Sequence, residues 1–183
     1  MSLKRNFNSQ TFVLLLMANK IARWAKKGKI MYHEIEAQWM GKMQFNALVN
    51  GHTIIMDAPE RVGGEDNGPI PKPFVLTALS GCTGMDIVNI LRKSQKEIQD
   101  FSIKVIGEIS KTPPIEYIAM HVQYFFIGKE ENRQAALDAV NDSQEKYCGV
   151  SHMFKKIMPV TWEVYFNGKQ IFNNNLETKA QLN

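Results

Sequence analysis

The sequence predicts an α+β domain in which a central helix is buried against a mainly antiparallel sheet. Three observations support this fold class: a long apolar stretch over residues 74–91, short runs of β-forming residues on both sides of it, and turn signals between those runs. The expected elements follow the order βββ-α-ββ-α-β. Because this order separates groups of strands by helices, it is typical of α+β domains.

The central helix is expected between about Lys72 and Gln95. Apolar and small residues lie almost all round its helical wheel, so the helix should be buried on most of its faces. Prolines stand only before or at its first turn, and cations follow at the end where the helix dipole favours them. Gly81 and Gly84 flank Cys82 and form a small-residue patch, which predicts either close packing or access for a small molecule.

The chain before this helix predicts a three-stranded antiparallel meander. Its expected strands cover residues 30–40, 43–49 and 53–57, and Asn50-Gly51 is a strong hairpin signal between the last two. Residues 58–73 are rich in turn formers and charges. A loop of this length predicts a function of its own.

The chain after the central helix predicts two longer strands, a helix and a last strand. The strands are expected at 100–111 and 115–127, separated by a Thr-Pro-Pro break, and the helix at 130–147, stopped by a glycine. Residues 150–157 suit one short helical turn. The final strand is expected at 160–166.

We therefore divide the chain into a basic N-terminal extension at 1–31, a domain at 32–172 and a frayed polar tail at 173–183. The extension contains seven of the 22 Lys and Arg residues and no acid, which leaves the remainder with about −3. This charge does not favour nucleic-acid binding by the domain. Residues 11–27 form an amphipathic helix pattern, open to three interpretations: an arm packed on its own domain or a dimer mate, a basic helix that contacts a membrane surface or partner, or a signal peptide.

Two cysteines, Cys82 and Cys148, are the main candidates for chemistry. A pair of cysteines without a convincing signal peptide suits a reducing compartment, so we expect a cytoplasmic protein. No metal or other cofactor is expected, since the histidines lack ligand spacing and no phosphate-binding glycine motif is present. The alternative for both cysteines is a purely structural role, because free cysteine is among the most buried residue types.

Several short motifs resemble the OsmC and organic hydroperoxide resistance (Ohr) proteins. The resemblance extends over about residues 32–166. Its motifs are Trp39-x-Gly41, Asp57, Gly63-Gly64, Gly68-Pro69-x-Pro71, Ala78-Leu79-x-Gly81-Cys82 with Asp86-Ile87, Gly128, and Ser143-x-x-x-Tyr147-Cys148-x-Val150. The resemblance implies an intertwined homodimer in which two central helices pack together inside wrapped sheets. It also implies thiol-dependent reduction of organic hydroperoxides, with an external thiol as the reductant.

The chemistry assigns different roles to the two thiols. A thiolate attacks the peroxide oxygen and becomes a sulfenic acid, which a second cysteine converts to a disulfide. Cys82, in the small-residue patch, would be the attacking thiol. Cys148, at a helix end where local movement is easier, would resolve the sulfenic acid.

One departure from the family pattern concerns the groups that activate the thiolate. Family peroxidases pair an early arginine with a glutamate nine or ten residues before the first cysteine, where this chain has Lys72 and Pro73. A thiol needs a nearby cation to ionise near neutral pH. Arg61, oriented by Glu60 or Glu65, could replace that pair, although plain solvated loop charges are the alternative. Peroxidase activity should then be weaker or different, and a non-catalytic dimer that binds a small hydrophobic ligand or partner stays open.

Overall fold

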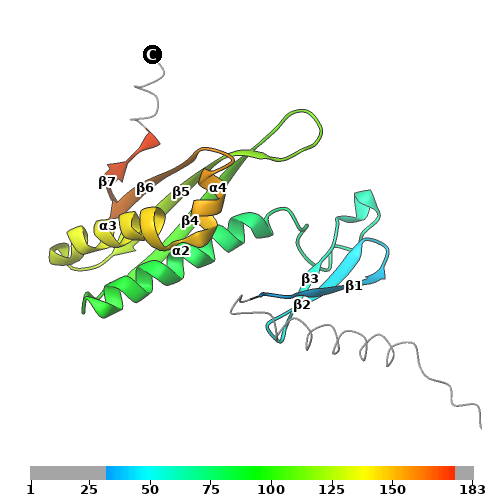
Figure 1. Cartoon of the computed structure of the whole chain (residues 1–183), viewed down its shortest axis with the longest axis horizontal. Coiled ribbons are helices and arrows are strands. Elements are labelled where there is room, and N and C mark those ends of the chain that lie inside the picture. Colours follow the sequence, from blue (N-terminus) through cyan, green and yellow to red (C-terminus); the bar gives the residue numbers. More distant parts are fainter. Residues whose placement is uncertain (1–31, 176–183) are drawn as a thin grey trace, which may run out of the picture.

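The computed structural model describes residues 32–175, and two sheets and a layer of helices make up this part of the chain (Figure 1). The strands are β1 (Glu36–Gly41), β2 (Gln44–Val49), β3 (His52–Met56), β4 (Asp100–Ile109), β5 (Tyr117–Ile127), β6 (Val160–Phe166) and β7 (Lys169–Asn173). The helices are α2 (Phe74–Lys93), α3 (Arg133–Asp142) and α4 (Gly149–Lys155), with short turns η1 (Glu60–Val62), η2 (Glu130–Asn132) and η3 (Ser143–Tyr147). The architecture is α+β, as predicted.

The strands form a three-stranded sheet in the order β1-β2-β3 and a four-stranded sheet in the order β4-β5-β6-β7. Every neighbouring pair is antiparallel except β5 and β6, which run parallel. A parallel pair needs a long crossover, and the chain from η2 to α4 supplies it. This crossover carries Cys148 back across the sheet.

The core lies between the four-stranded sheet and the helices that cover one of its faces (Figure 1). Alternate residues of β5 point into it, because side chains on a strand change face at every residue. Met120, Val122, Tyr124 and Phe126 are all buried there. Ile118, at the start of the same face, is 42% exposed.

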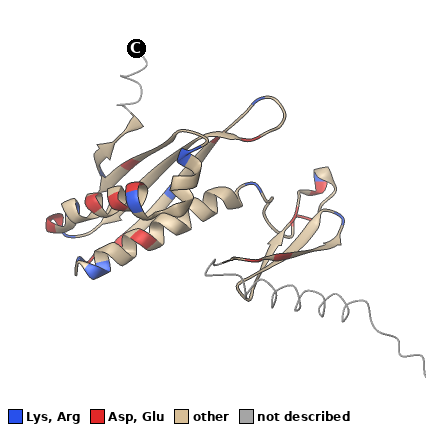
Figure 2. Ribbon diagram, in the orientation of Figure 1, with Lys and Arg blue, Asp and Glu red and all other residues tan. Residues whose placement is uncertain are grey.

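Helix α2 is buried along one stripe only, which corrects the expectation of burial on most faces. Leu79, Thr83 and Ile87 face the core, whereas Met85 is 76% and Val88 54% exposed. The helix is uncharged from its start as far as Asp86 (Figure 2). Within residues 32–175 it alone has the length and composition of a membrane span, a property that the core helix of a globular domain shares.

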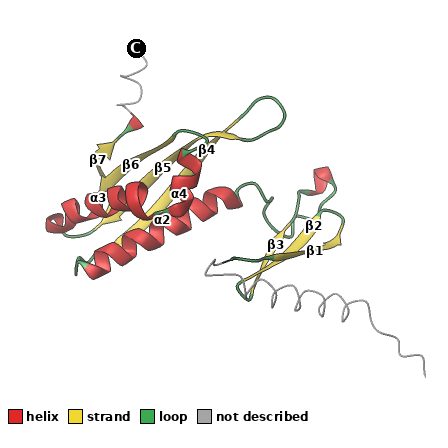
Figure 3. Cartoon of the chain, viewed as in Figure 1, coloured by secondary structure: helices red, strands yellow, loops and turns green. Residues whose placement is uncertain are grey.

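The sheet of β1, β2 and β3 lies beyond the start of α2, apart from the helix layer and the larger sheet (Figure 3). Large apolar side chains are exposed on it, among them Trp39 (62%), Leu48 (52%) and Phe45 (43%). Exposed apolar surface of this extent on a small sheet indicates a surface that another element covers.

The loop between β3 and α2 is organised by the buried carboxylate of Asp57. Its oxygens accept hydrogen bonds from the backbone N–H groups of Ala58, Glu65 and Asn67 at 2.8, 3.0 and 3.2 Å. Burial alone would raise the pKa of Asp57, yet the backbone donors hold it below its usual value. A Cβ atom at Gly64 would approach the carbonyl oxygen of Ala58 to 1.8 Å, so this tight loop requires glycine there. The glycine-rich motif is thus explained by structure.

Several expected boundaries are corrected. The first strand begins at Glu36, not at residue 30, and the helix expected over 130–147 is divided into η2, α3 and η3. Strand β7 was not predicted. The expected tail is structured as far as residue 175: Asn173 ends β7, and the backbone N–H of Asn174 donates to the carbonyl of Trp162 in β6 at 3.1 Å. The amphipathic pattern at 11–27 and the rest of the tail lie outside the described residues.

Replacing Ile87 by alanine should lower the free energy of unfolding by about 2–5 kcal/mol, because the fully buried side chain would leave a cavity between α2 and the sheet. Urea unfolding at constant protein concentration measures this change. Ile157→Ala is the matched control, since Ile157 is 75% exposed and its loss should change stability by less than about 0.5 kcal/mol. Equal losses in the two variants would contradict the assignment of the core.

Candidate functional site

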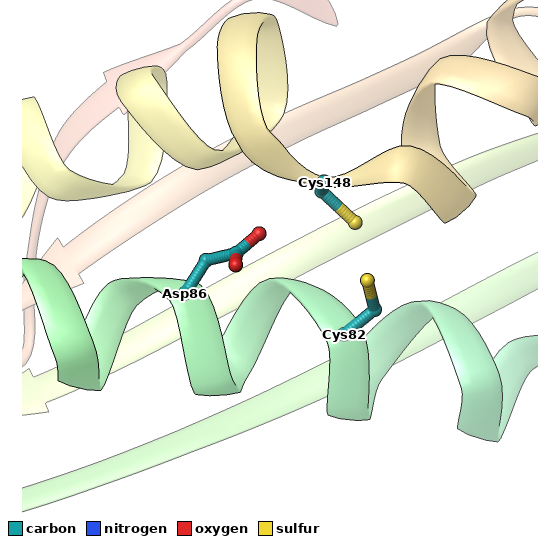
Figure 4. A group of neighbouring side chains, drawn as sticks. All are labelled: Cys82, Asp86 and Cys148. Atoms are coloured by element: carbon teal, nitrogen blue, oxygen red, sulfur yellow. The ribbon is translucent and has the colours of Figure 1, made fainter. Parts of the chain in front are cut away.

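The two cysteines, sixty-six residues apart in the chain, face each other across the contact between α2 and the crossover (Figure 4). Cys82 comes from the middle of α2, and Cys148 from the junction of η3 and α4. Their sulfur atoms lie within 4.8 Å of each other. Both are free thiols, and a disulfide between them would require the sulfurs to approach to about 2.05 Å.

Asp86 completes a group of three side chains. It follows Cys82 by one helical turn, so both point from α2 in the same direction. One of its carboxylate oxygens lies within 4.8 Å of both sulfurs (Figure 4). The sequence analysis noted Asp86 only as part of a motif; its spacing of four from Cys82 was the signal that placed it beside the thiol.

The backbone that presents Cys148 has an unusual local form. Residues Ser143–Tyr147 form a π-helical turn, closed by the N–H of Cys148 donating to the carbonyl of Ser143 at 2.8 Å. Such turns often mark functional sites. Cys148 then caps α4, because its sulfur accepts the N–H of Ser151 at 3.4 Å.

Burial dominates the ionisation of Cys148, whose side chain is 2% exposed. It raises the pKa of the thiol to about 11, and the neighbouring Cys82 adds to the increase, while the N–H of Ser151 opposes it. Cys148 is therefore a protonated thiol near neutral pH. Cys82 is more exposed.

A buried chain of hydrogen bonds holds the two halves of the site together. The hydroxyl of Thr83, next to Cys82, lies 2.9 Å from both the Tyr124 and Ser143 hydroxyls. The amide of Gln144 donates to the Tyr124 hydroxyl at 2.5 Å and accepts from the Ser151 hydroxyl at 2.6 Å. Burial raises the pKa of Tyr124 to about 12, so this chain is neutral. In the described part of the molecule no buried side-chain nitrogen or oxygen lacks a partner.

Lys155, which the sequence analysis did not single out, is a cation of this region. Its ammonium donates to the carbonyl of Gln144 at 2.8 Å and lies 4.5 Å from the centre of the Trp162 ring. Burial lowers the pKa of Lys155, and the charges of Glu145 and Cys148 oppose that change. The seven-residue spacing from Cys148 to Lys155 gave no signal by itself.

The predicted activating groups are not beside the thiols in this chain. Glu65 forms an ion pair with Lys42 at 2.6 Å, and Arg61 lies in η1, in the loop that follows the small sheet. Lys72 donates to the carbonyl of Ile115 at 2.6 Å. Within residues 32–175 neither sulfur has a hydrogen bond from arginine or lysine, so the activating roles of Arg61 and Glu65 stay a prediction.

The fold and the site define an α+β protein with two facing thiols, one on its core helix and one on the crossover that packs against it. A model of the family described as OsmC-like protein matches residues 64–163, more than half of the chain. The chain belongs to this family, which confirms the resemblance found in the sequence.

Known relatives agree with this assignment. Protein YhfA of Escherichia coli is 29% identical over 129 residues, which cover 70% of this chain and 93% of the relative. A hypothetical protein from Aquifex aeolicus is 27% identical, with a TM-score of 0.62 over 75% of this chain and 99% of its own. An organic hydroperoxide resistance protein from Elizabethkingia anophelis, with crystallant-derived thiocyanate bound, shares the fold at 14% identity, with a TM-score of 0.58 over 76% of this chain and 100% of its own.

The raised pKa of Cys148 predicts different alkylation profiles for the two thiols. We compare Cys82 in Cys148→Ser with Cys148 in Cys82→Ser. Cys82 should react faster with iodoacetamide, because it is more exposed and because burial raises the pKa of Cys148 to about 11, so that Cys148 stays protonated below that pH. Labelling of Cys148 should keep increasing as the pH approaches that value, because a raised pKa keeps the thiol protonated where an ordinary thiol ionises. Mass spectrometry gives both rates. In denaturant the two rates should converge; equal rates in the folded variants would refute the difference in environment.

Proposed function

We propose that this protein reduces organic hydroperoxides with the thiols of Cys82 and Cys148. The observation that supports the proposal is the approach of the two sulfurs to within 4.8 Å from distant parts of the chain. A purely structural role for two free cysteines does not require them to face each other. Membership of a family with members named for organic hydroperoxide resistance is consistent with this chemistry.

The reaction balances with one hydroperoxide and two thiols. The Cys82 thiolate attacks the terminal oxygen, the O–O bond breaks, and the alkoxide leaves as an alcohol after it takes a proton. The resulting sulfenic acid condenses with the Cys148 thiol, which releases water and forms the disulfide. An external thiol then supplies the two electrons that restore both cysteines. We propose a reducing compartment, the cytoplasm, as the source of that thiol.

The environments of the two cysteines support this order. Cys148 is buried and its pKa is raised, so little of it is thiolate and it is a poor attacking group. Cys82 is less buried and lies in a helix between Gly81 and Gly84; a Cβ atom at Gly81 would meet no atom within 4 Å. In the single chain the open space beside Gly81 gives a small oxidant a path towards Cys82. In a dimer that covers this side of α2, the oxidant would enter at the edge of the contact.

A homodimer is the second part of the proposal. The exposed face of α2 borders a hollow of about 520 Å³, lined mainly by apolar side chains such as Met85, Val88, Phe101 and Ile103. The sheet of β1–β3 also exposes apolar side chains. A second copy that packed α2 against α2 and wrapped its small sheet around the pair would cover both surfaces and complete the burial expected for the central helix. It could also bring Arg61 or Glu65 of one subunit near the thiols of the other.

The absence of an arginine beside either sulfur in the described chain favours a second function. In this alternative the protein is a non-catalytic dimer that binds a small hydrophobic ligand or partner. The ligand or partner would then occupy the part of the hollow beside α2 that the second copy leaves open. Unchanged thiols after hydroperoxide treatment would favour this alternative.

Treating the fully reduced protein with cumene hydroperoxide should form one disulfide per chain, because the thiol that resolves the sulfenic acid is already adjacent. Intact mass and peptide mapping would show the loss of two hydrogen atoms and a Cys82–Cys148 link. Cys148→Ser should stop at a sulfenic acid that a dicarbonyl reagent traps, and Cys82→Ser should stay reduced. Persistence of both thiols in the unaltered protein would refute the proposed reaction.

Replacing Val88 by glutamate should convert a dimer into monomers, because a charge would be buried in the apolar contact between two α2 helices. Light scattering on a sizing column would measure the mass in solution. Ile157→Glu offers the control, since it adds the same charge at an exposed apolar residue outside α2. A dimer that survives Val88→Glu would show that α2 does not form the contact.

A further inference from the structure

The thiols of Cys82 and Cys148 and the carboxylate of Asp86 form a cluster that peroxide chemistry does not fully explain. Each side chain offers one ligand atom, and the three atoms lie within 4.8 Å of one another (Figure 4). The proposed hydroperoxide reaction uses the two sulfurs and a group that favours the thiolate, and it assigns no role to Asp86. A carboxylate beside a thiol disfavours the thiolate that such a reaction requires, so its position calls for another explanation.

We propose that the reduced protein binds one Zn²⁺ ion per chain through Cys82, Cys148 and Asp86. Zinc prefers thiolate, imidazole and carboxylate ligands, and metal–ligand distances of about 2.3 Å for sulfur and 2.0–2.2 Å for oxygen place tetrahedral ligand atoms somewhat under 4 Å apart. The observed cluster needs only small side-chain rotations to reach that spacing. Two thiolates favour a borderline-soft ion such as Zn²⁺ over Mg²⁺ or Ca²⁺.

The elements that carry the three ligands suit such a site. Cys82 and Asp86 are one turn apart on the same side of α2, a spacing that lets two side chains of one helix hold one ion. Cys148 approaches from the opposite side, on the buried junction between η3 and α4. The Ser143 hydroxyl lies 3.3 Å from a carboxylate oxygen of Asp86, and this second contact would orient the ligand.

The charges around the cluster are compatible with a bound ion. Two thiolates and a carboxylate carry three negative charges, one more than Zn²⁺ neutralises. The ammonium of Lys155, whose charge interacts with Cys148, would offset the remaining negative charge. Three protein ligands leave the fourth tetrahedral position for water or another small ligand. Binding would release the thiol protons to solvent, since the thiolate is the form that coordinates metal.

Metal binding and disulfide formation would exclude each other, because both use the same sulfur atoms. Zinc would therefore protect the two thiols from oxidants, and an oxidised chain would release the ion. This inference does not require the peroxidase activity: a dithiol–carboxylate site would bind zinc in a catalytic or a non-catalytic protein.

The test uses the full chain without an affinity tag, fully reduced, and titrates Zn²⁺ in competition with a chromophoric chelator. We expect one ion per chain. Cys82→Ser, Cys148→Ser and Asp86→Asn should each weaken binding by at least about 100-fold, because each removes a direct ligand, a larger loss than the roughly 10- to 100-fold that follows the loss of a group supporting a ligand. Co²⁺ in place of Zn²⁺ should give a thiolate-to-cobalt charge-transfer band that either serine variant loses.

Asp138→Asn is the matched control, because this exposed carboxylate on α3 is bonded only to Gln134, four residues away, and not to a sulfur. It should bind zinc like the unaltered protein, and so should not resemble Asp86→Asn. Far-UV circular dichroism verifies that each variant is folded. The proposal is overturned if the unaltered protein binds zinc no better than a variant without both cysteines, or if Asp86→Asn and Asp138→Asn bind equally well.

A second measurement separates this proposal from the peroxidase function. Stoichiometric Zn²⁺ should slow disulfide formation by hydroperoxide at least about 10-fold, and a chelator should restore the rate, because the coordinated sulfurs are occupied. Disulfide formation without any zinc binding would refute the metal site alone. Zinc binding by a protein whose thiols ignore hydroperoxide would refute the peroxidase function alone.

Discussion

The contact between the middle of α2 and the π-helical turn η3 is the constraint on which the site depends. Thr83 makes this contact specific, since its buried hydroxyl meets the Ser143 and Tyr124 hydroxyls at 2.9 Å. A buried hydroxyl without a partner would cost about 1–3 kcal/mol, so sliding α2 along the crossover is unfavourable. Cys82 precedes Thr83 by one residue and Cys148 ends the turn that Ser143 begins. The hydrogen bonds that fix the helices therefore also fix the distance between the sulfurs.

The same contact gives the two cysteines unequal surroundings. Cys148 is enclosed by the crossover and the sheet, whereas Cys82 lies in a small-residue stretch of a helix whose other side is open in the single chain. The proposed division into an attacking and a resolving thiol rests on that difference. The carboxylate of Asp86 lies within 4.8 Å of both sulfurs. In the proposed zinc site it would supply the third ligand, so the same centre would suit a divalent cation as well as an oxidant. The two roles would alternate with the oxidation state of the sulfurs.

The apolar surface left exposed connects the fold to assembly. Met85 and Val88 on α2 and Trp39 and Leu48 on the small sheet are large apolar side chains in contact with solvent. Within residues 32–175 nothing covers these side chains, and the small sheet lies away from the helix layer (Figure 1). Dimerisation is the simplest way for the family fold to bury them. The prediction that α2 is a central helix would then be correct for the dimer, although it fails for the chain alone.

The sequence by itself determined the fold class, the meander with its Asn50-Gly51 turn, and the limits of α2 to within two residues. These features follow from apolar periodicity and turn residues, which act locally. It also singled out the two cysteines as candidate site residues. It did not determine β7, because Lys169–Asn173 has only two apolar residues and becomes a strand by pairing with the adjacent β6. Nor did it determine the division of the helix after residue 130, where the π turn follows from packing. The placement of Asp86 and Lys155 was also decided by tertiary structure. Which side chains meet Cys148 depends on how the crossover returns over the sheet, and no local pattern specifies that distance.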